Sequence, residues 1–443
     1  MNILHYTIGL PPTRHGGSVQ YAFDLMKEQA KNNKVYALIC GDTLFRSNRC
    51  TFKPIGNQDG FKTYKLTNPT TPSLLYGMKD PQTQMRKIKI DTARIKRFIT
   101  SNNIEIFHIH TLMGLSPDVV KFVKSLNVKI IYTTHDFYGI CPHTNLLDYD
   151  GLPCKSASPE RCAKCNMTAP SDFFMRLCNS SLYHLIKSCI PISKGKVITT
   201  TTSDRYSTET PNHKIISGFS LLLDFYKKYF SLIDLFIFNS TQTQNIFKEF
   251  IPFAKGITIP VVTNGIKDLR APLTQCTKIR LGYIGNLKDY KGFSSLRSTL
   301  LALYNEGFDN WELNVYGAHE GEDTACNNIH YKGHYSHENI SDILYLLDGV
   351  IVPSKWYETF SLVTLEALAH GRPTLVSSTV GAKDIVRKLI PEMIFTNSAD
   401  LYEKLKRIIS NKSILIDLNQ KILMPHWPYN ISFHTQEVLN AYK

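Results

Sequence analysis

Residues 353–371 have the sequence PSKWYETFSLVTLEALAHG, and this stretch decides the fold predicted for the chain. The β-branched run at 349–352, just before it, predicts a buried strand. The apolar residues of its second half recur at helical spacing, and Gly371 is a residue that commonly ends a helix. Residues 373–377 then predict another strand. A strand, a loop, a helix and a strand in this order predict a parallel βαβ unit.

Two glutamates mark the loop and the helix of this unit. Glu358 lies where the first strand ends, at the edge where open α/β sheets bind ligands, and Glu366 lies near the start of the helix. Carboxylates at this edge can accept hydrogen bonds from sugar or ribose hydroxyls, while backbone N–H groups at the helix start can hold phosphate. The alternative is a solvated Glu358 and a Glu366 that complements the helix dipole.

The run ETFSLVTLEALAHGRP at 358–373 resembles the donor-site signature of retaining glycosyltransferases of family 4. The resemblance covers nearly the whole chain and implies the GT-B fold, an α/β fold with two Rossmann-like domains that face each other across a cleft. It also implies that Glu358 orients the sugar ring and that Glu366 binds the ribose. The donor contacts that it implies come from consecutive residues: Glu358, Thr359, Phe360, Ser361 and Leu362.

A glycine-rich loop follows the first predicted strand. Gly16 and Gly17 stand between this strand and a predicted helix, and glycines at such a turn let the backbone approach a ligand closely. They resemble the loop that lies over the donor diphosphate in the family. The alternative is an ordinary tight turn.

A second loop, NLKDYKG at 286–292, opens the second predicted domain. Lys291 matches the lysine that binds the donor diphosphate in the family. Asn286 stands where the family commonly has an arginine, so this half of the diphosphate clamp departs from the pattern, and Lys288 is the candidate to compensate.

Two histidines follow consecutive predicted strands. His110 ends the strand at 104–110, and His135 follows the strand at 128–134, so both belong to the same edge of a parallel sheet. They resemble the acceptor-side walls of the family, and we expect one of them to bind the transferred sugar or the leaving phosphate. The alternative is a buried structural histidine.

Four cysteines lie close together in a segment that is poor in apolar residues. Cys141, Cys154, Cys162 and Cys165 include a C-x2-C pair, and this spacing fits a zinc site with four cysteine ligands. Four thiolates leave no open coordination position, so the zinc would be structural, and catalysis would need no cofactor. The alternative is four unligated thiols.

The composition limits the class of protein. A length of 443 residues predicts two or three domains, and no apolar run of 18 residues predicts a transmembrane helix. The chain begins directly with a predicted strand, so we expect no signal peptide, and its ten cysteines favour free thiols or metal in a cytoplasmic protein. The net charge of +14 suits nucleic acid, anionic membranes or phosphate-bearing substrates.

We therefore predict a domain at 1–265 with a cysteine-rich insertion at 141–165, a nucleotide-sugar-binding domain at 278–425, and a helix at 426–443 that crosses back to the first domain. The predicted activity is retaining sugar transfer from a nucleotide sugar, with UDP favoured over GDP. The resemblance implies a glycan or polyprenyl-pyrophosphate-linked acceptor in the synthesis of a surface polysaccharide such as O-antigen or capsule.

Two segments of the chain, one basic and one amphipathic, favour contact with a membrane. A predicted helix at 86–97 carries six lysines and arginines, and the stretch at 219–235 alternates aromatic residues and lysines. Together they predict an enzyme that is peripheral to the inner face of the cytoplasmic membrane. The alternative is that these helices pack on the first domain.

Two other functions remain open from the sequence. A nucleotide-sugar 2-epimerase shares the two-domain architecture but needs no acceptor site, so the histidine-ended strands favour transfer. A zinc-containing nucleic-acid-binding protein would also be basic. Its charge would gather in one region, whereas here the basic residues are spread over both halves of the chain, and we expect no nucleic-acid partner.

Overall fold

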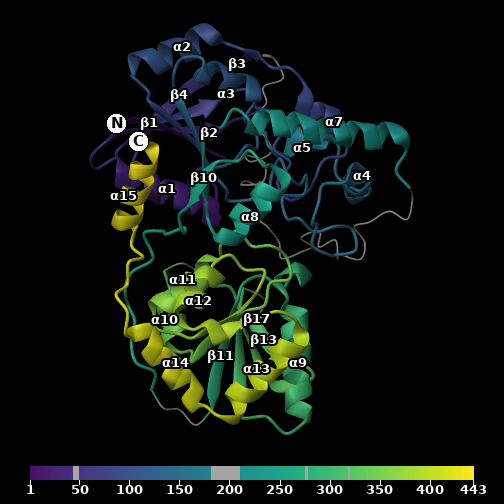
Figure 1. Ribbon diagram of the computed structural model, residues 1–443, viewed down its shortest axis with the longest axis vertical. Helices are drawn as coiled ribbons and strands as arrows, with labels where there is room; N and C mark the ends of the chain where they lie inside the picture. Colours follow the sequence, from purple (N-terminus) through teal and green to yellow (C-terminus); the bar gives the residue numbers. More distant parts are fainter. Residues whose placement is uncertain (43–48, 181–209, 275–277, 318–319, 337) are drawn as a thin grey trace. The chain divides into compact units, whose positions relative to one another are not determined.

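The computed structural model describes residues 1–42, 49–180, 210–274, 278–317, 320–336 and 338–443 (Figure 1). The chain forms two compact units. The first comprises Met1–Asn239, Thr243–Ile259 and Thr435–Lys443, and the second comprises Ser240–Gln242 and Pro260–His434.

In the first unit, the described residues form an eight-stranded sheet in the order β10-β9-β8-β7-β1-β2-β5-β4 and a two-stranded sheet of β3 and β6. The strands are β1 Asn2–Thr7, β2 Lys34–Cys40, β3 Arg49–Cys50, β4 Phe52–Gln58, β5 Phe61–Leu66, β6 Lys89–Ile90, β7 Ile106–Ile109, β8 Lys129–Thr133, β9 Leu235–Phe238 and β10 Gly256–Thr258. The helices are α1 Gly17–Gln29, η1 Pro81–Met85, α2 Thr92–Ser101, α3 Pro117–Lys124, α4 Pro159–Asn166, α5 Asp172–Cys178, α7 His213–Phe230, α8 Thr241–Phe250 and α15 Ile431–Tyr442.

The strand order reverses between β1 and β7. From β1 the chain continues outward through β2 and β5, and from β7 it continues outward through β8, β9 and β10 on the other side. All neighbouring pairs of the large sheet are parallel except β4 and β5. A reversal of this kind opens a crevice at the carboxyl ends of the two central strands, where open α/β sheets bind ligands.

Helix α7 shows where the amphipathic stretch belongs. Its apolar face is buried in the first unit through Phe219, Leu222, Tyr226, Tyr229 and Phe230. The hydroxyl of Tyr226 donates to the hydroxyl of Tyr138 at 2.7 Å, and the hydroxyl of Tyr229 donates to a backbone carbonyl at 3.0 Å. The aromatic face therefore belongs to the protein core, as in the packing alternative, and is not free to lie on a membrane.

The predicted basic helix at 86–97 is wrong at its start. Helix α2 begins only at Thr92, because the Asp91 side chain caps it by accepting from the backbone N–H of Arg94 at 3.1 Å. Before this cap, Lys89–Ile90 form the edge strand β6, and Arg86 follows η1 in extended conformation. Some of the lysines and arginines of this segment therefore lie outside any helix.

In the second unit, the described residues form a seven-stranded sheet in the order β13-β14-β12-β11-β15-β16-β17. The strands are β11 Ile279–Ile284, β12 Trp311–Tyr316, β13 Glu320–Asp323, β14 Cys326–Lys332, β15 Gly349–Val352, β16 Thr374–Ser377 and β17 Ile394–Phe395. The helices are η3 Asp289–Lys291, α9 Phe293–Asn305, α10 Ile340–Tyr345, α11 Leu362–Ala369, α12 Lys383–Leu389, η4 Pro391–Met393, α13 Ser398–Ser410 and α14 Ser413–Leu423.

Helices cover both faces of this second sheet, with α9 and α13 on one side and α10 and α14 on the other (Figure 1). All neighbouring strands are parallel except β13 and β14. Here too the order reverses, between β11 and β15. The predicted parallel βαβ unit is confirmed, since β15 and β16 pair in parallel from Val350 opposite Thr374, with α11 between them.

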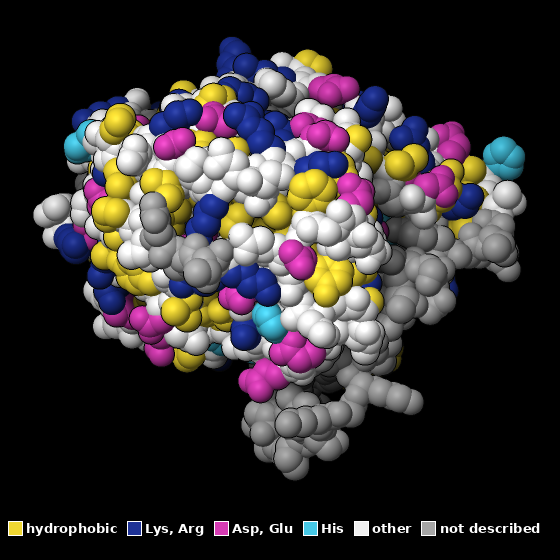
Figure 2. Space-filling view, turned by 90° about the horizontal axis from the view of Figure 1, so that it is seen from below, with side chains coloured by type: hydrophobic (Ala, Val, Ile, Leu, Met, Phe, Trp, Pro, Cys, Tyr) yellow, Lys and Arg dark blue, Asp and Glu magenta, His cyan; other side chains and the backbone are white. Residues whose placement is uncertain are grey.

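Two surface properties complete the description. In the described part of the chain, no helix combines the length and the apolar character that crossing a bilayer requires. On the face of the molecule shown in Figure 2, basic and acidic side chains are interspersed with hydrophobic ones.

Candidate functional site

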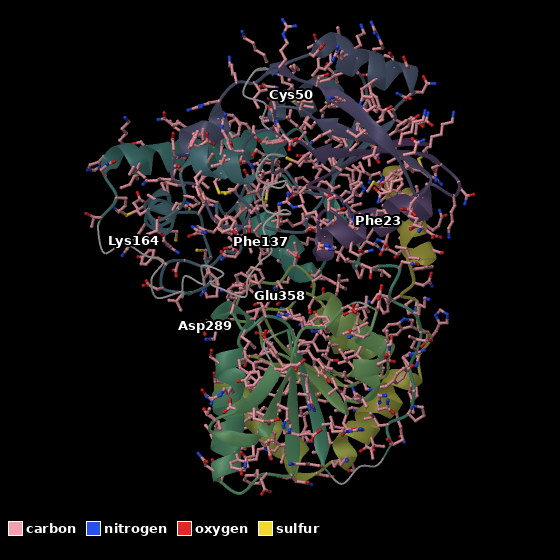
Figure 3. All side chains as sticks on the ribbon, turned by 180° about the vertical axis from the view of Figure 1, so that it is seen from behind. Phe23, Cys50, Phe137, Lys164, Asp289 and Glu358 are labelled. Carbon is pink, nitrogen blue, oxygen red and sulfur yellow. The ribbon has the colours of Figure 1, made fainter. Side chains whose placement is uncertain are left out.

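The reversal between β11 and β15 brings two predicted site loops together. The loop after β11 carries Lys291, and the loop after β15 carries Glu358; the two strands are neighbours in the sheet. Figure 3 shows Glu358 and Asp289, one from each loop, at the same end of this sheet. The candidate donor residues thus meet at the position where open α/β sheets bind their ligands.

Glu358 accepts hydrogen bonds from three side chains of this site. Its side chain is only 8% exposed, and Oε1 accepts from Lys291 Nζ at 2.6 Å, from Trp356 Nε1 at 3.2 Å and from the hydroxyl of Ser354. Burial raises the pKa of Glu358, but the Lys291 ammonium and these hydrogen bonds outweigh it and hold the pKa below its usual value. Glu358 is therefore a carboxylate at neutral pH.

Close backbone packing holds the two loops together. Gly292 has φ +78°, and a Cβ at this position would lie 1.8 Å from the carbonyl oxygen of Pro353. The Tyr290 and Trp356 rings pack with centroids 4.6 Å apart, and the backbone N–H of Lys355 donates to the carbonyl of Tyr290 at 2.9 Å. Only glycine permits this approach at residue 292.

A third loop, after β16, fixes the backbone of Glu358. The N–H of Glu358 donates to the carbonyl of Thr379 at 3.0 Å, and the carbonyl of Glu358 accepts from the N–H of Gly381 at 3.0 Å. A Cβ on Gly381 would lie 2.3 Å from the carbonyl oxygen of Thr359. Residues from three adjacent strands thus hold the glutamate in place.

The remaining predicted donor residues lead from Glu358 into helix α11. Phe360 is buried, Thr359 and Leu362 are half-buried, and Ser361 precedes the helix with φ +105°. Positive φ at a residue other than glycine is a backbone strain that proteins tend to keep at functional positions. Glu366 is 7% exposed on α11 and lies near Tyr335, whose pKa is raised by burial first and by the charge of Glu366 second.

The side chain of Asn286 does not replace the arginine that the family commonly has at this position, because it bonds within its own turn. Its Oδ1 accepts from the N–H of Lys288 at 3.3 Å, and its carbonyl accepts from the hydroxyl of Tyr283 at 2.6 Å. Asn286 thus shapes the turn after β11, and Lys291 is the cation of this loop that reaches Glu358.

In the first unit, Gly16 and Gly17 lie at the start of α1 and are exposed. Gly16 has φ +136°, and a Cβ there would meet nothing within 4 Å. The first turn of α1 contains no acidic side chain, so its N–H groups and the helix dipole favour an anion.

The two predicted catalytic histidines belong to a chain of buried hydrogen bonds. His110 Nδ1 lies 3.3 Å from His135 Nε2, and His110 Nε2 lies 3.0 Å from Nδ1 of His5 on β1. His5 Nε2 in turn lies 2.8 Å from Oε1 of Gln29 on α1. His110 is 1% exposed, whereas His135 is half-buried, so His135 is the member of the pair that can reach a ligand.

The direction of the hydrogen bonds in this histidine chain follows from the side-chain amide of Gln29. Its Nε2 donates to the hydroxyl of Tyr442 at 3.1 Å, so its Oε1 accepts the proton of His5 Nε2. Burial lowers the pKa of His5 to about 4, against the Gln29 hydrogen bond, so His5 is neutral and its Nδ1 accepts from His110 Nε2. His110 Nδ1 then accepts from His135 Nε2, and the lone pair of His135 lies on Nδ1.

His135 Nδ1 faces Asn239 at the end of β9, with Asn239 Nδ2 3.4 Å away. Beside it, burial raises the pKa of Asp136 to about 6, against a hydrogen bond from the N–H of Tyr138. The site edge of the first unit therefore carries a histidine whose tautomer is fixed and a carboxyl group that titrates near neutral pH.

Three of the histidines have ligand atoms within 4.8 Å of one another, namely His5, His108 and His110. Their nitrogens already have hydrogen-bond partners. His108 Nδ1 lies 2.6 Å from the Tyr442 hydroxyl, and His108 Nε2 lies 2.7 Å from the hydroxyl of Thr133. These hydrogen bonds account for the cluster, so we interpret it as a positioning network.

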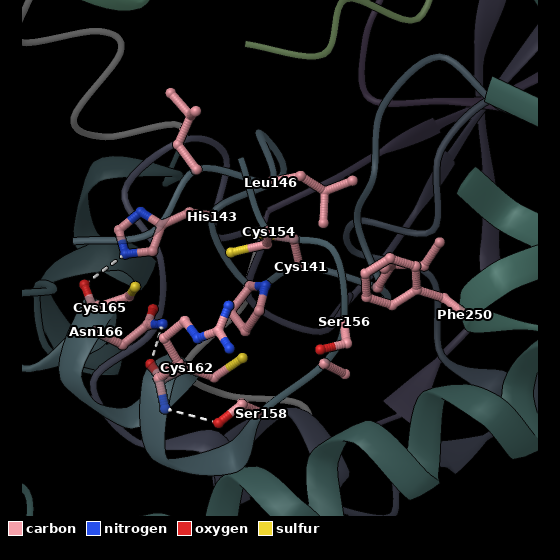
Figure 4. A pocket seen from close by; sticks show the side chains of 15 residues that line it. Cys141, His143, Leu146, Cys154, Ser156, Ser158, Cys162, Cys165, Asn166 and Phe250 are labelled. Atoms are coloured by element: carbon pink, nitrogen blue, oxygen red, sulfur yellow. Dashed lines mark hydrogen bonds between the residues drawn. The ribbon is translucent and has the colours of Figure 1, made fainter. Parts of the chain in front are cut away.

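The four predicted metal-ligating cysteines lie in the first unit, around one pocket that is also lined by His143 and Arg161 (Figure 4). The structure thus places Cys141, Cys154, Cys162 and Cys165 around the same pocket.

Several contacts of the two sites were missing from the sequence interpretation. Ser354 and Trp356 lie inside the quoted stretch but have no periodicity that would single them out. His5, Gln29 and Asn239 lie on separate elements, so only the sheet order brings them to His110 and His135. A polar side chain in an otherwise apolar strand, as His5 is in β1, is the one signal that could have indicated them.

Parts of the chain are similar in sequence to known proteins. Residues 278–411 match the family model described as glycosyl transferases group 1. An uncharacterized 42.6 kDa protein in the cps region of Klebsiella pneumoniae is 22% identical over 343 residues, which cover 76% of this chain and 72% of that protein.

Solved structures show the same fold over the full length. Sucrose-phosphate synthase from Thermosynechococcus elongatus has a TM-score of 0.58 at 15% identity, and the match covers 100% of this chain and 98% of the synthase chain. Anabaena HepE in complex with UDP and glucose has a TM-score of 0.54 at 14% identity, with coverage of 99% and 98%. The predicted α/β fold with two Rossmann-like domains is confirmed.

Proposed function

We propose that this protein transfers a sugar from a UDP-activated donor, with retention of the anomeric configuration, to a glycan acceptor carried on polyprenyl pyrophosphate. The observation that carries the proposal is the meeting of Lys291 and Glu358 at the reversal of the second sheet. Both residues lie in the segment that matches glycosyl transferases group 1, and Glu358 is the first residue of the signature at 358–373.

Charge development explains the proposed roles in the second unit. Negative charge grows on the donor diphosphate as the glycosidic bond breaks, and a fixed cation next to it lowers the barrier. Lys291 supplies this cation in the second unit. Glu358, ionised and held by Lys291, Ser354 and Trp356, accepts from hydroxyls of the sugar ring.

The first unit contributes His135. Its ring is half-buried, and the hydrogen bond to His110 fixes its orientation. His135 binds the transferred sugar or the leaving phosphate, and His110 positions it from behind. A front-face route with retention is consistent with the ion-paired state of Glu358, because a carboxylate engaged by three donors is a poor nucleophile.

Two observations support the finer assignment of donor and acceptor. HepE, which shares the fold, is described in complex with UDP, and the Klebsiella relative is encoded in a cps region. The net charge of +14 and the exposed Phe173 and Phe174 on α5, which are 68% and 53% accessible, favour contact with an anionic membrane. The aromatic face of α7 is buried and supplies none of this contact.

The test is transfer itself. The protein is incubated with UDP-sugars and a short polyprenyl-pyrophosphate glycan, and the product anomer is assigned by NMR, with E358Q as the low-activity control. In parallel, UDP at about 100 times its dissociation constant should stabilise the protein by roughly 2.7 kcal/mol, unlike CDP. Formation of a 2-epimer of the UDP-sugar without acceptor would favour the epimerase instead.

Membrane contact has its own test. Flotation with anionic vesicles should succeed at low salt and fail at high salt, because about 1 kcal/mol per nearby lysine or arginine is screened. No flotation at low salt, together with transfer to a soluble glycan, would contradict the lipid-linked acceptor and leave the sugar transfer intact.

A further inference from the structure

The four-cysteine pocket of the first unit has no part in the proposed sugar transfer. It lies in the segment between β8 and α5, and its cysteines come from three separate pieces of that segment. Cys141 follows β8, Cys154 follows the antiparallel bridge between Leu147 and Pro153, and Cys162 and Cys165 lie on α4. We propose that these four cysteines bind one structural zinc ion.

The local fold of α4 places two of the cysteines on one helix face. Ser158 caps α4 by accepting from the N–H of Arg161 at 3.3 Å, and Pro159 occupies the first turn. Cys162 and Cys165 are three residues apart on this helix and therefore share a face. Figure 4 shows the sulfur atoms of Cys154 and Cys162 pointing into the same space.

All four cysteines line this one pocket, and each is a free thiol. Four thiols around one pocket are a donor set that a divalent cation binds as thiolates.

The surroundings suit a zinc–thiolate centre. Ile140, Leu146 and Phe250 line the pocket and restrict water. Arg161 lines the same pocket, and its positive charge complements the double negative charge of a zinc ion with four thiolates. Four sulfur donors select zinc over magnesium or calcium, and they leave no open position for catalysis.

The sulfur positions need a small adjustment. No three of the four sulfur atoms meet the 4.8 Å spacing that the histidines of the first unit meet, within the described part of the chain. A cysteine has one side-chain torsion with three staggered wells, so a sulfur can move to another well while the backbone stays in place. All four are free thiols, so no disulfide opposes this movement.

The ion would add a link between parts of the first unit that hydrogen bonds already connect. Asn166, at the end of α4, accepts from the N–H of Met78 at 2.8 Å, and His143 donates from Nε2 to the carbonyl of Cys165 at 2.8 Å. Both bonds join a residue outside the helix to the end of α4. A zinc ion bound both by Cys141 and by the cysteines of α4 would join the end of β8 to this helix. This link would stabilise the first unit.

The experiment measures metal in the full chain, purified in reducing buffer without chelator. Elemental analysis should find about one zinc per chain, and a mercurial that blocks thiols should release it. C162S and C165S should lose the zinc, whereas C326S, a buried cysteine of β14 in the second unit, should keep it. Cobalt exchanged into the wild type should give the intense visible absorption bands of tetrahedral thiolate coordination. Because this measurement uses the wild type, it does not depend on the folding of a variant.

Three results would overturn the proposal. The first is a metal-free protein that takes up neither zinc nor cobalt in reducing buffer. The second is iron instead of zinc, which would refute the assignment of the ion. The third is equal zinc content in C162S and C326S, which would place the metal elsewhere.

Discussion

Lys291 and Glu358 belong to two different strand-to-helix loops, yet Nζ and Oε1 lie 2.6 Å apart. The lysine predicted to hold the diphosphate and the glutamate predicted to hold the sugar are therefore one ion pair. A donor that binds here receives a cation and an anion whose positions are already set by each other, because each fixes the rotamer of its partner.

The first prediction concerns this cation. K291A should weaken binding of UDP by about 1.5–3 kcal/mol, the range of a hydrogen bond to a charged group. Isothermal titration calorimetry measures this change. Lys355 is an exposed lysine of the neighbouring loop that pairs with Asp289, and K355A should leave the affinity close to that of the wild type. Wild-type affinity in K291A would show that the phosphate is held elsewhere.

The second prediction separates the two glutamates. E358Q should lower kcat roughly 10-fold to 100-fold with little change in UDP affinity, because the lost charge faces the sugar. E366A should mainly weaken the binding of free UDP. Steady-state kinetics and calorimetry on both variants distinguish these outcomes, and identical effects on UDP binding would contradict the division of roles.

The third prediction tests the packing of the two loops. G292A should lower both thermal stability and UDP affinity, since its Cβ would lie 1.8 Å from the Pro353 carbonyl oxygen. Gly307 offers a matched control, with φ +87° and open space around its Cβ, so G307A should show only the cost of the backbone conformation, about 1 kcal/mol. Equal losses in both variants would mean that the loop contact contributes nothing.

The fourth prediction concerns the histidine chain. H110N keeps an oxygen that can accept from His135 Nε2, whereas H110F keeps an aromatic ring, a slightly larger one, and removes both hydrogen bonds. H110F should therefore lose roughly 10-fold or more in kcat, the cost of a buried hydrogen bond, and H110N should retain more activity. Similar kcat values for H110F and the wild type would exclude a role for the chain in catalysis.

The fifth prediction is the pH dependence of stability. Burial lowers the pKa of His5 from 6.5 to about 4, so between these values the unfolded chain binds a proton that the native chain does not. Stability should therefore fall as the pH falls from 7 to 5, with a contribution from His5 of roughly 2 kcal/mol. Asp136, whose pKa is raised, acts in the opposite direction.

Variants isolate this contribution. Thermal unfolding at pH 7 and pH 5 should show a smaller difference for H5N than for the wild type. H213N, which changes an exposed histidine at the start of α7, should behave like the wild type. An unchanged pH dependence in H5N would refute the assignment.

The sequence by itself determined the parts of this protein that depend on local periodicity. The apolar spacing after residue 361, with Gly371 behind it, predicted α11 and its flanking strands, because a period of 3.6 and a β-branched run each fix one backbone conformation. The position of His110 and His135 at one sheet edge followed from parallel strand order. The start of the basic helix was wrong, because the Asp91 cap outweighed the charge pattern.

Tertiary structure decided the contacts between residues far apart in the chain. The residues of α7 alone do not determine whether its aromatic face contacts lipid or protein. The packing of this face on Tyr138 shows that it contacts protein. Lys291 and Glu358 are 67 residues apart, and His5 and His110 are 105 apart. These pairs exist because the strand order places β11 beside β15 and β1 beside β7, and strand order is set by the burial of whole elements, which no local pattern encodes.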